Sequence, residues 1–440
     1  MRTANSPWYS RYLKAMVPVV PFGNTYDGVA FSGGAMMLAL TMGWGEAVGG
    51  IPFSPDQVRK SFEHLPLQTF NSQLPKEVPY LREWVQHPAY DAYWRARGVD
   101  HRYDRVTVPT LNIGGWYDIF SRETLDLATG VRQHGRTAFV RTNQFVIMGP
   151  WGHGIGTRKL GELDFGPEAM LKLSQRQDQW NEHWLRGIDR GIGQWPPYHL
   201  FVMGENRWRA EREWPLARTR FTPYYLGGSG HANSLRGDGT LAVDRPRRRS
   251  GSADQFVYDG NHPVPTKGGN NLVGVSSGPE DQTAVESRED VLVYTTAPLD
   301  ADLEVTGPVR LILWASSSAR DTDFTGKLVD VYPDGKAYNL CEGIQRARYR
   351  RGTDREVFLT PGKPERFEID LWVTSNVFLR GHRIRLEVSS SNFPRFDRNP
   401  NTGNSFGSDA VLLPATQTIL HDRAHPSHLL LPMIPRNSVK

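Results

Sequence analysis

The sequence of 440 residues contains a single cysteine, Cys341, which excludes a disulfide within the chain. It also lacks any run of about eighteen apolar residues, the length that a membrane-spanning helix requires. The first residues do not show the charged-then-apolar layout of a signal peptide. We therefore expect a cytoplasmic protein that does not attach to a membrane and in which Cys341 fills space in a hydrophobic core.

The composition excludes disordered and collagen-like chains. With 38% hydrophobic and 22% charged residues, the sequence is that of a globular protein long enough for two or three domains. The net charge of +5 comes mainly from arginine, in clusters at 245–249 and 346–351. Acidic residues are interspersed almost throughout, and neither cluster lies on a long amphipathic helix. We therefore expect no nucleic-acid partner.

Motifs for cofactors and metals are missing as well. The sequence contains no phosphate-binding loop and no dinucleotide-binding fingerprint. His421, Asp422, His425 and His428 lie close together, but Pro426 interrupts the spacing that a metal site would need. We expect neither a cofactor nor a metal.

Two short apolar strands, each ending in or beside glycine, lead to the polar residues of most interest. The first strand spans Val108–Gly115 and is followed by Asp118, and the second spans Gln144–Pro150 and is followed by His153. The helix-length segment Arg122–His134 between them predicts a β–α–β crossover with parallel strands. Reactive groups in such sheets lie just beyond the carboxyl ends of the strands, so we expect Asp118 and His153 to share one crevice.

An aspartate and a histidine placed in this way can work as a pair. The carboxylate holds the Nδ1 proton of the imidazole, fixes its tautomer and stabilises the imidazolium that forms when Nε2 takes a proton from a hydroxyl. Aspartate before histidine on consecutive strand ends is the order found in α/β-hydrolases. Trp116, Tyr117, Phe120 and Trp151 flank the pair. One interpretation places these aromatic side chains in a substrate pocket, and the other places them in the core.

The remainder of the chain divides into a helical part and a β-rich part. Residues 25–105 carry helix signals, among them Ser54 as an N-cap followed by proline, and a further helix is expected over Glu168–Arg186. Residues 227–290 are rich in glycine, serine, asparagine and proline and predict a loop-dominated connection. Short strands are expected at Val291–Thr296, Leu303–Ser316, Lys327–Tyr332, Phe367–Val373 and Arg383–Ser390. Pro333-Asp334-Gly335 predicts a hairpin turn. This pattern predicts a β-sandwich of the jelly-roll type.

Several motifs in a fixed order carry a specific resemblance to a known family. Gly114-Gly115-Trp116-Tyr117-Asp118, Gly149-Pro150-Trp151-Gly152-His153-Gly154 and Asp164-Phe165-Gly166 resemble the cocaine-esterase and X-prolyl dipeptidyl-peptidase family of serine hydrolases. Further similarities extend over nearly the whole chain. The resemblance implies a catalytic triad in which Asp118 is the acid and His153 the base. It also implies that the substrates are small-molecule esters or amides, cleaved through an acyl-enzyme.

The same resemblance implies the fold and its division into parts. The expected fold is α/β plus all-β: a partial α/β-hydrolase sheet with a helical cap inserted, followed by a C-terminal jelly-roll β-sandwich. Residues 1–24 would be a remnant of the hydrolase domain and 25–105 the cap. Residues 106–200 would be the rest of the hydrolase domain, and 201–440 the linker and the β-sandwich.

The sequence offers no convincing serine nucleophile. Ser32, in Ala30-Phe31-Ser32-Gly33-Gly34, has the spacing of some lipase nucleophile turns, but the residues before it are too few for the sheet strands that precede such a turn. The apolar segment Leu13–Pro21 predicts a buried strand. The resemblance places the nucleophile, and the oxyanion-hole amides, before this segment. We therefore expect a truncated chain that is inactive by itself.

Two other hypotheses remain open. Ser32 could be a true nucleophile, in which case Ser32→Ala would abolish labelling by a fluorophosphonate probe. Alternatively, the chain could be a non-catalytic binding protein built from the cap and the jelly roll. In either case an incomplete sheet would expose edges that favour pairing with a complementing N-terminal fragment or with a second copy of the chain.

Overall fold

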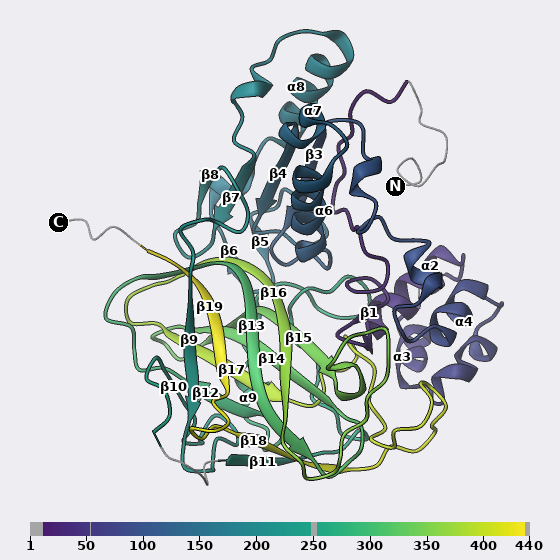
Figure 1. Cartoon of the computed structure of the whole chain (residues 1–440), viewed down its shortest axis with the longest axis vertical. Coiled ribbons are helices and arrows are strands. Elements are labelled where there is room, and N and C mark those ends of the chain that lie inside the picture. Colours follow the sequence, from purple (N-terminus) through teal and green to yellow (C-terminus); the bar gives the residue numbers. More distant parts are fainter. Residues whose placement is uncertain (1–11, 53, 248–252, 436–440) are drawn as a thin grey trace.

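A four-stranded sheet with helices on both faces forms one end of the molecule (Figure 1). This structure is a computed structural model that describes residues 12–52, 54–247 and 253–435. The sheet runs in the order β3 (Thr110–Gly115), β4 (Gln144–Gly149), β7 (Tyr198–Val202) and β8 (Arg207–Glu211). The first three strands are parallel and β8 is antiparallel. Residues 1–11 of the predicted remnant lie outside the described residues, as do residues 248 and 249 of the first arginine cluster.

The predicted crossover is confirmed. Helix α6 (Ser121–His134) connects β3 to β4, with the short helix α7 (Ala138–Thr142) before β4. Val146 and Met148 of β4 pack in the same cluster as residues of α6. Phe145 and Ile147 pack with Trp180 of α8 (Leu173–Arg186). Both faces are thus covered, which explains why every residue of β3 and β4 is buried.

Two predicted elements differ in the structure. The segment expected as a buried strand at Leu13–Pro21 is only half-buried and joins β3 through isolated parallel bridges, Met16 to Thr110 and Val19 to Ile113. Pro18 has no N–H and cannot donate to a regular ladder. The helix expected from Glu168 begins at Leu173, because Gly166 adopts a positive φ and a single 3₁₀ turn, Pro167–Ala169, comes first.

The cap packs as a helical cluster beside the β-rich part (Figure 1). Ser54 caps α3 as expected, since its side chain accepts a hydrogen bond from Gln57 N. A hairpin that was not predicted, β1 (Phe31–Ser32) with β2 (Ala35–Met36), begins this region. The other elements are a π-helix at Ala39–Trp44, α2 (Gly45–Val48), α3 (Pro55–Glu63), a 3₁₀ helix at Leu67–Gln73, α4 (Pro79–Gln86), α5 (Ala92–Arg95) and a 3₁₀ turn at Tyr103–Arg105.

The C-terminal part is a β-sandwich, in agreement with the predicted fold class. Its strands run in the order β11-β18-β13-β19-β9-β10-β12-β17-β14-β15, and β16 also pairs with β13. The strands are β9 (Arg220–Gly227), β10 (Thr240–Ala242), β11 (Ala253–Tyr258), β12 (Leu292–Thr295), β13 (Leu303–Ser317), β14 (Asp323–Val331), β15 (Ala337–Arg346), β16 (Glu365–Phe378), β17 (Arg383–Ser389), β18 (Ala415–Leu420) and β19 (His428–Ile434). The connection at 227–290 therefore contains two strands and the short helix α9 (Thr283–Glu286), besides its loops.

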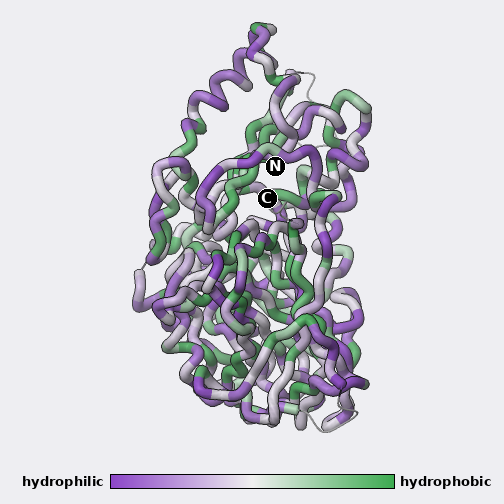
Figure 2. The backbone as a smooth tube through the Cα atoms, turned by 90° about the vertical axis from the view of Figure 1, so that its left-hand side faces the viewer, coloured by the Kyte–Doolittle hydropathy of each residue, from purple (hydrophilic) through white to green (hydrophobic). Residues whose placement is uncertain are grey.

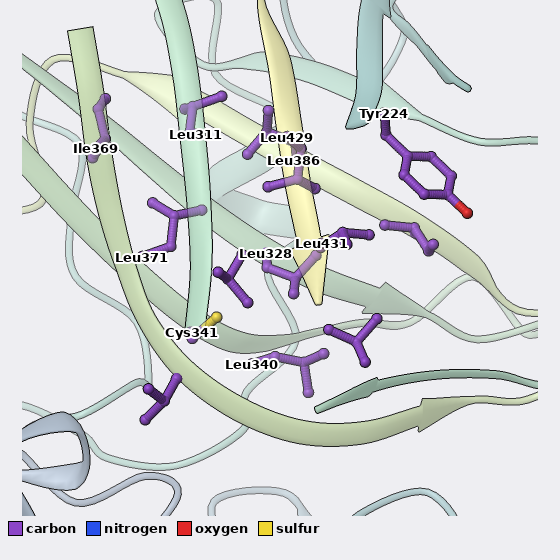
Figure 3. Packing of buried hydrophobic residues seen from close by; sticks show 14 of the residues in the cluster. Tyr224, Leu311, Leu328, Leu340, Cys341, Ile369, Leu371, Leu386, Leu429 and Leu431 are labelled. Carbon is purple, nitrogen blue, oxygen red and sulfur yellow. The ribbon is translucent and has the colours of Figure 1, made fainter. Parts of the chain in front are cut away.

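The largest core fills the sandwich. Figure 3 shows leucine side chains from several strands meeting around the thiol of Cys341. Cys341 is 2% exposed, as its expected role in the core requires. Figure 2 shows hydrophobic residues gathered in the strands of the interior and hydrophilic residues along the outer loops. Small elements remain: the hairpin β5 (Lys159–Leu160) with β6 (Leu163–Asp164), and 3₁₀ turns at Ile192–Gln194 and Ala347–Tyr349. Among the described residues, no helix is both long and apolar enough to span a membrane.

Candidate active site

Asp118 lies in the turn that connects β3 to α6, and its side chain has no exposed surface. One carboxylate oxygen, Oδ1, accepts a hydrogen bond from Phe120 N at 2.8 Å. The backbone of the turn is tied to the end of β4, because Trp116 N donates to Gly149 O and Tyr117 N donates to Trp151 O. These bonds leave the second oxygen, Oδ2, as the one that is directed away from its own turn.

His153 lies just beyond the end of β4 and completes the pair. Its Nδ1 is 2.8 Å from Asp118 Oδ2, and its side chain is 33% exposed. A carboxylate at Nδ1 selects the tautomer that carries a proton there, which leaves Nε2 as a proton acceptor on the exposed side. The structure therefore brings together the two polar residues that the sequence placed at neighbouring strand ends.

The glycines at the strand ends allow the two turns to approach closely. A Cβ added to Gly115 would lie 2.1 Å from the carbonyl oxygen of Trp151, and one added to Gly149 would lie 2.4 Å from the Trp151 ring. Neither distance is compatible with a side chain. Packing therefore explains why the two strands end in glycine, since only residues without a side chain let the turn of Asp118 contact the turn of His153.

Of the four flanking aromatic residues, three are core residues with no exposed surface. Trp116 Nε1 donates to Phe201 O, Tyr117 OH to Asn339 O, and Trp151 Nε1 to Ala169 O, at 2.7 to 3.0 Å. Their buried positions favour the core interpretation over a substrate pocket. Phe120 differs, because its ring contacts that of His153 edge-on at 5.9 Å and that of Phe22 at 4.9 Å.

Ser32 lies on the hairpin β1–β2 and not on a strand-to-helix turn. Gly33 and Gly34, both with positive φ, make the turn of this hairpin. Gly33 O accepts hydrogen bonds from Arg346 N and from the Gln345 side chain, so the hairpin packs on β15. The two glycines therefore serve a hairpin contact with the sandwich.

The clustered histidines at the C-terminus bond to separate partners. His421 Nε2 is 2.8 Å from Asp254, His425 Nδ1 is 3.1 Å from Asp422, and His428 Nδ1 is 2.7 Å from Pro426 O. No group of three or more potential metal-binding side chains occurs in the part of the chain that the structure describes.

Two arginines of the second cluster lie in the interior of the sandwich. Arg346 is 2% exposed and pairs with Asp323 and Asp397, while Arg348 pairs with Asp321. Arg351, at the end of the cluster, is exposed and pairs with Glu365.

Two residues near the pair were not predicted. Glu123, on the first turn of α6, accepts hydrogen bonds from Gly23 N and Asn24 N where the chain leads into the cap, and burial raises its pKa to about 7. Asn270, from the loop-dominated connection, donates to the carbonyl oxygens of Trp116 and Asp118. An isolated asparagine in a glycine-rich stretch carries no local signal of such a contact.

Comparisons with known proteins agree with this arrangement. Residues 8–155 match the family described as X-Pro dipeptidyl-peptidase (S15 family), and residues 190–430 match the X-Pro dipeptidyl-peptidase C-terminal non-catalytic domain. Cocaine esterase from Rhodococcus sp. (strain MB1 Bresler) is 36% identical over 451 residues, which cover 96% of this chain and 77% of the esterase. The chain belongs to the cocaine-esterase and X-Pro dipeptidyl-peptidase family. The resemblance seen in the sequence is therefore confirmed.

Solved structures in this group share the fold. An aminopeptidase from the marine sediment archaeon Thaumarchaeota archaeon aligns with a TM-score of 0.83 and 25% identity, covering 97% of this chain and 73% of its own. An alpha-amino acid ester hydrolase aligns with a TM-score of 0.80 and 25% identity, covering 98% of this chain and 74% of its own. By its family, the chain is a serine hydrolase that acts on ester or peptide bonds.

Proposed function

We propose that Asp118 and His153 are the acid and base of a serine hydrolase that cleaves acyl esters or amides through an acyl-enzyme. The observation that carries the proposal is the 2.8 Å contact between His153 Nδ1 and a fully buried Asp118, with the imidazole partly open to solvent. The names of the relatives, an esterase, an aminopeptidase and an amino acid ester hydrolase, support an acyl substrate.

In this mechanism His153 Nε2 takes the proton of the attacking serine hydroxyl and later gives it to the leaving alcohol or amine. Asp118 keeps the ring oriented and stabilises the imidazolium. Its own position is fixed by the bond from Phe120 N, so that Oδ2 stays directed at Nδ1. The rings of Phe120 and Phe22 give the side of His153 an apolar surface that suits the acyl part of a substrate.

We infer that the nucleophile and the oxyanion-hole amides come from a segment that docks at the free edge of the sheet. Met16, Pro18 and Val20 bond to β3 through their backbone, whereas the backbone groups of Val17 and Val19 have no partner among the described residues. Unpaired groups of this kind are a template for a further strand. A cavity of about 290 Å³ beside them, lined mainly by apolar residues such as Leu127 and Val131, would take its side chains.

Labelling with a fluorophosphonate tests the proposal. The 440-residue chain alone should remain unlabelled. Co-expression with a separate polypeptide that carries the nucleophile segment of the family should give a complex that is labelled on the added segment and that hydrolyses p-nitrophenyl esters. Labelling of the chain alone that Ser32→Ala abolishes would instead make Ser32 the nucleophile. A dimer without labelling would favour pairing between copies at the same edge.

Substitutions at the pair test the roles in the labelled complex. His153→Ala and Asp118→Asn should each lower kcat by about 10⁴-fold, since both disturb the proton transfer to and from the serine. His134→Ala, at the exposed end of α6, is the matched control and should keep the parent kcat. Unchanged turnover in His153→Ala would refute the assignment.

A further inference from the structure

Asn270 connects the β-rich half of the chain to the turn that carries Asp118. Its side chain is 2% exposed. The amide Nδ2 donates to Trp116 O at 2.9 Å and to Asp118 O at 2.8 Å, and it lies 3.3 Å from Ser121 Oγ. One side-chain amide thus binds the backbone on both sides of Tyr117, at the start of α6.

The loop that presents Asn270 is locked by its own hydrogen bonds. Gly269 and Gly278 exchange backbone hydrogen bonds at 2.7 and 2.9 Å, which closes the loop at its base. The neighbouring Asn271 donates to Gly268 O and Ser276 O. Gly269 adopts a positive φ, and a Cβ there would lie 2.5 Å from Glu342 Oε1. The loop therefore holds Asn270 in one place against β15.

A buried ion pair ties Asn270 to the sandwich. Arg395 Nη1 donates to Asn270 O at 3.0 Å and to Glu342 Oε1 at 2.8 Å. The second oxygen of Glu342 accepts from Asn392. Arg395 also lies 5.0 Å from the ring of Trp372, and its side chain is 2% exposed. Hydrogen bonds therefore connect Glu342 to Arg395, Arg395 to Asn270 and Asn270 to the backbone of Asp118. This series of bonds lies entirely in the interior.

We propose that Asn270 is a positioning residue for the acid of the catalytic pair, which makes the β-rich half a working part of the active site. This inference rests on the proposed roles of Asp118 and His153. Asn270 lies within the residues that match a C-terminal domain described as non-catalytic, so no role of this kind is assigned to it. The amide fixes the carbonyls at 116 and 118, and these set the direction in which Asp118 Oδ2 meets the imidazole.

Removal of the amide leaves the carbonyl oxygen of Trp116 without a donor and takes one of two donors from that of Asp118, which keeps the bond from Ser121 N. A buried polar group without its partner is costly. The turn is then free to move toward another donor, and the hydrogen bond between Asp118 and His153 weakens. Asn270→Asp has the same shape but places carboxylate oxygens against those carbonyls, so repulsion displaces the turn without creating a cavity.

NMR of the His153 Nδ1 proton tests the inference on the whole chain, independently of turnover. In the parent this proton should give a strongly deshielded signal, because it lies in a hydrogen bond to a buried carboxylate. In Asn270→Ala and Asn270→Asp the signal should move upfield and its exchange with water should accelerate by about tenfold or more. Circular dichroism establishes that each variant is folded.

Asn399→Ala is the matched control. Asn399 is also a buried amide, 2% exposed, and its side chain bonds to Asp321, Asp323 and Asn401 instead of to the loop of Asn270 or the turn of Asp118. It should lower the melting temperature as Asn270→Ala does and leave the His153 signal at its parent position and exchange rate. The inference is overturned if Asn270→Ala and the control variant change the His153 signal equally, or if neither of them changes it. It is also overturned if the parent shows no such proton. Failure of the proposed hydrolysis with an intact signal would count against the function and not against the positioning.

Discussion

Gly115→Ala should separate the turn of Asp118 from that of His153. The added Cβ would lie 2.1 Å from Trp151 O, whereas contacts under 3.0 Å essentially do not occur. The carbonyl cannot swing aside, because it accepts the hydrogen bond from Tyr117 N. The two turns must therefore move apart by about 0.9 Å, which would stretch the 2.8 Å contact between Asp118 and His153 beyond hydrogen-bond range.

The size of the effect follows from two terms. Overpacking a rigid backbone contact costs about 1–3 kcal/mol. Loss of the bond between the two side chains adds about 1 kcal/mol. Urea unfolding should therefore show a loss of about 2–4 kcal/mol in the free energy of unfolding, together with loss of the deshielded His153 Nδ1 proton.

Gly154→Ala is the matched control for this substitution. Gly154 is next to His153, yet a Cβ there meets nothing within 4 Å. Its unfolding free energy should stay within about 0.5 kcal/mol of the parent, with the proton signal retained. If Gly115→Ala were as stable as Gly154→Ala and kept the signal, the packing argument for the Gly-rich strand ends would be wrong.

Three further predictions concern the remainder of the molecule. Arg346→Met should lower the free energy of unfolding by about 3–5 kcal/mol in urea, since two buried carboxylates lose their partner; Arg366→Met, at an exposed pair, should change it by less than about 0.5 kcal/mol. Burial, with a smaller contribution from Arg176, lowers the pKa of His199 from 6.5 to about 4, so the unfolded state alone gains a proton as pH falls through this range. The free energy of unfolding should fall by about 2–3 kcal/mol from pH 6.5 to 4, and equal slopes for the parent and His199→Gln would contradict this. Burial raises the pKa of the Cys341 thiol, and a thiol reagent should therefore label it only at the rate of global unfolding; labelling that is fast without urea would refute the burial.

Local patterns were sufficient for the parts of the fold that have regular burial. The strands at 110–115 and 144–149 and the helix between them were predicted because sheet strands covered on both faces are short, mainly apolar segments. The Pro333-Asp334-Gly335 turn likewise joins β14 to β15, where Gly335 takes the positive φ that the turn requires. The regular strand expected over Leu13–Pro21 does not form, because proline interrupts the hydrogen-bond ladder to β3.

The sequence by itself determined that Asp118 and His153 follow two neighbouring parallel strands, and this was enough to place them in one crevice. Only the tertiary structure decided which groups surround them. The burial of Trp116 and Trp151, the hairpin position of Ser32 and the contact from Asn270 depend on segments that are far apart in the chain. The periodicity of apolar residues indicates which side of its own helix or strand is buried. Contacts between residues about 150 positions apart depend instead on how the sheet, the cap and the sandwich pack together.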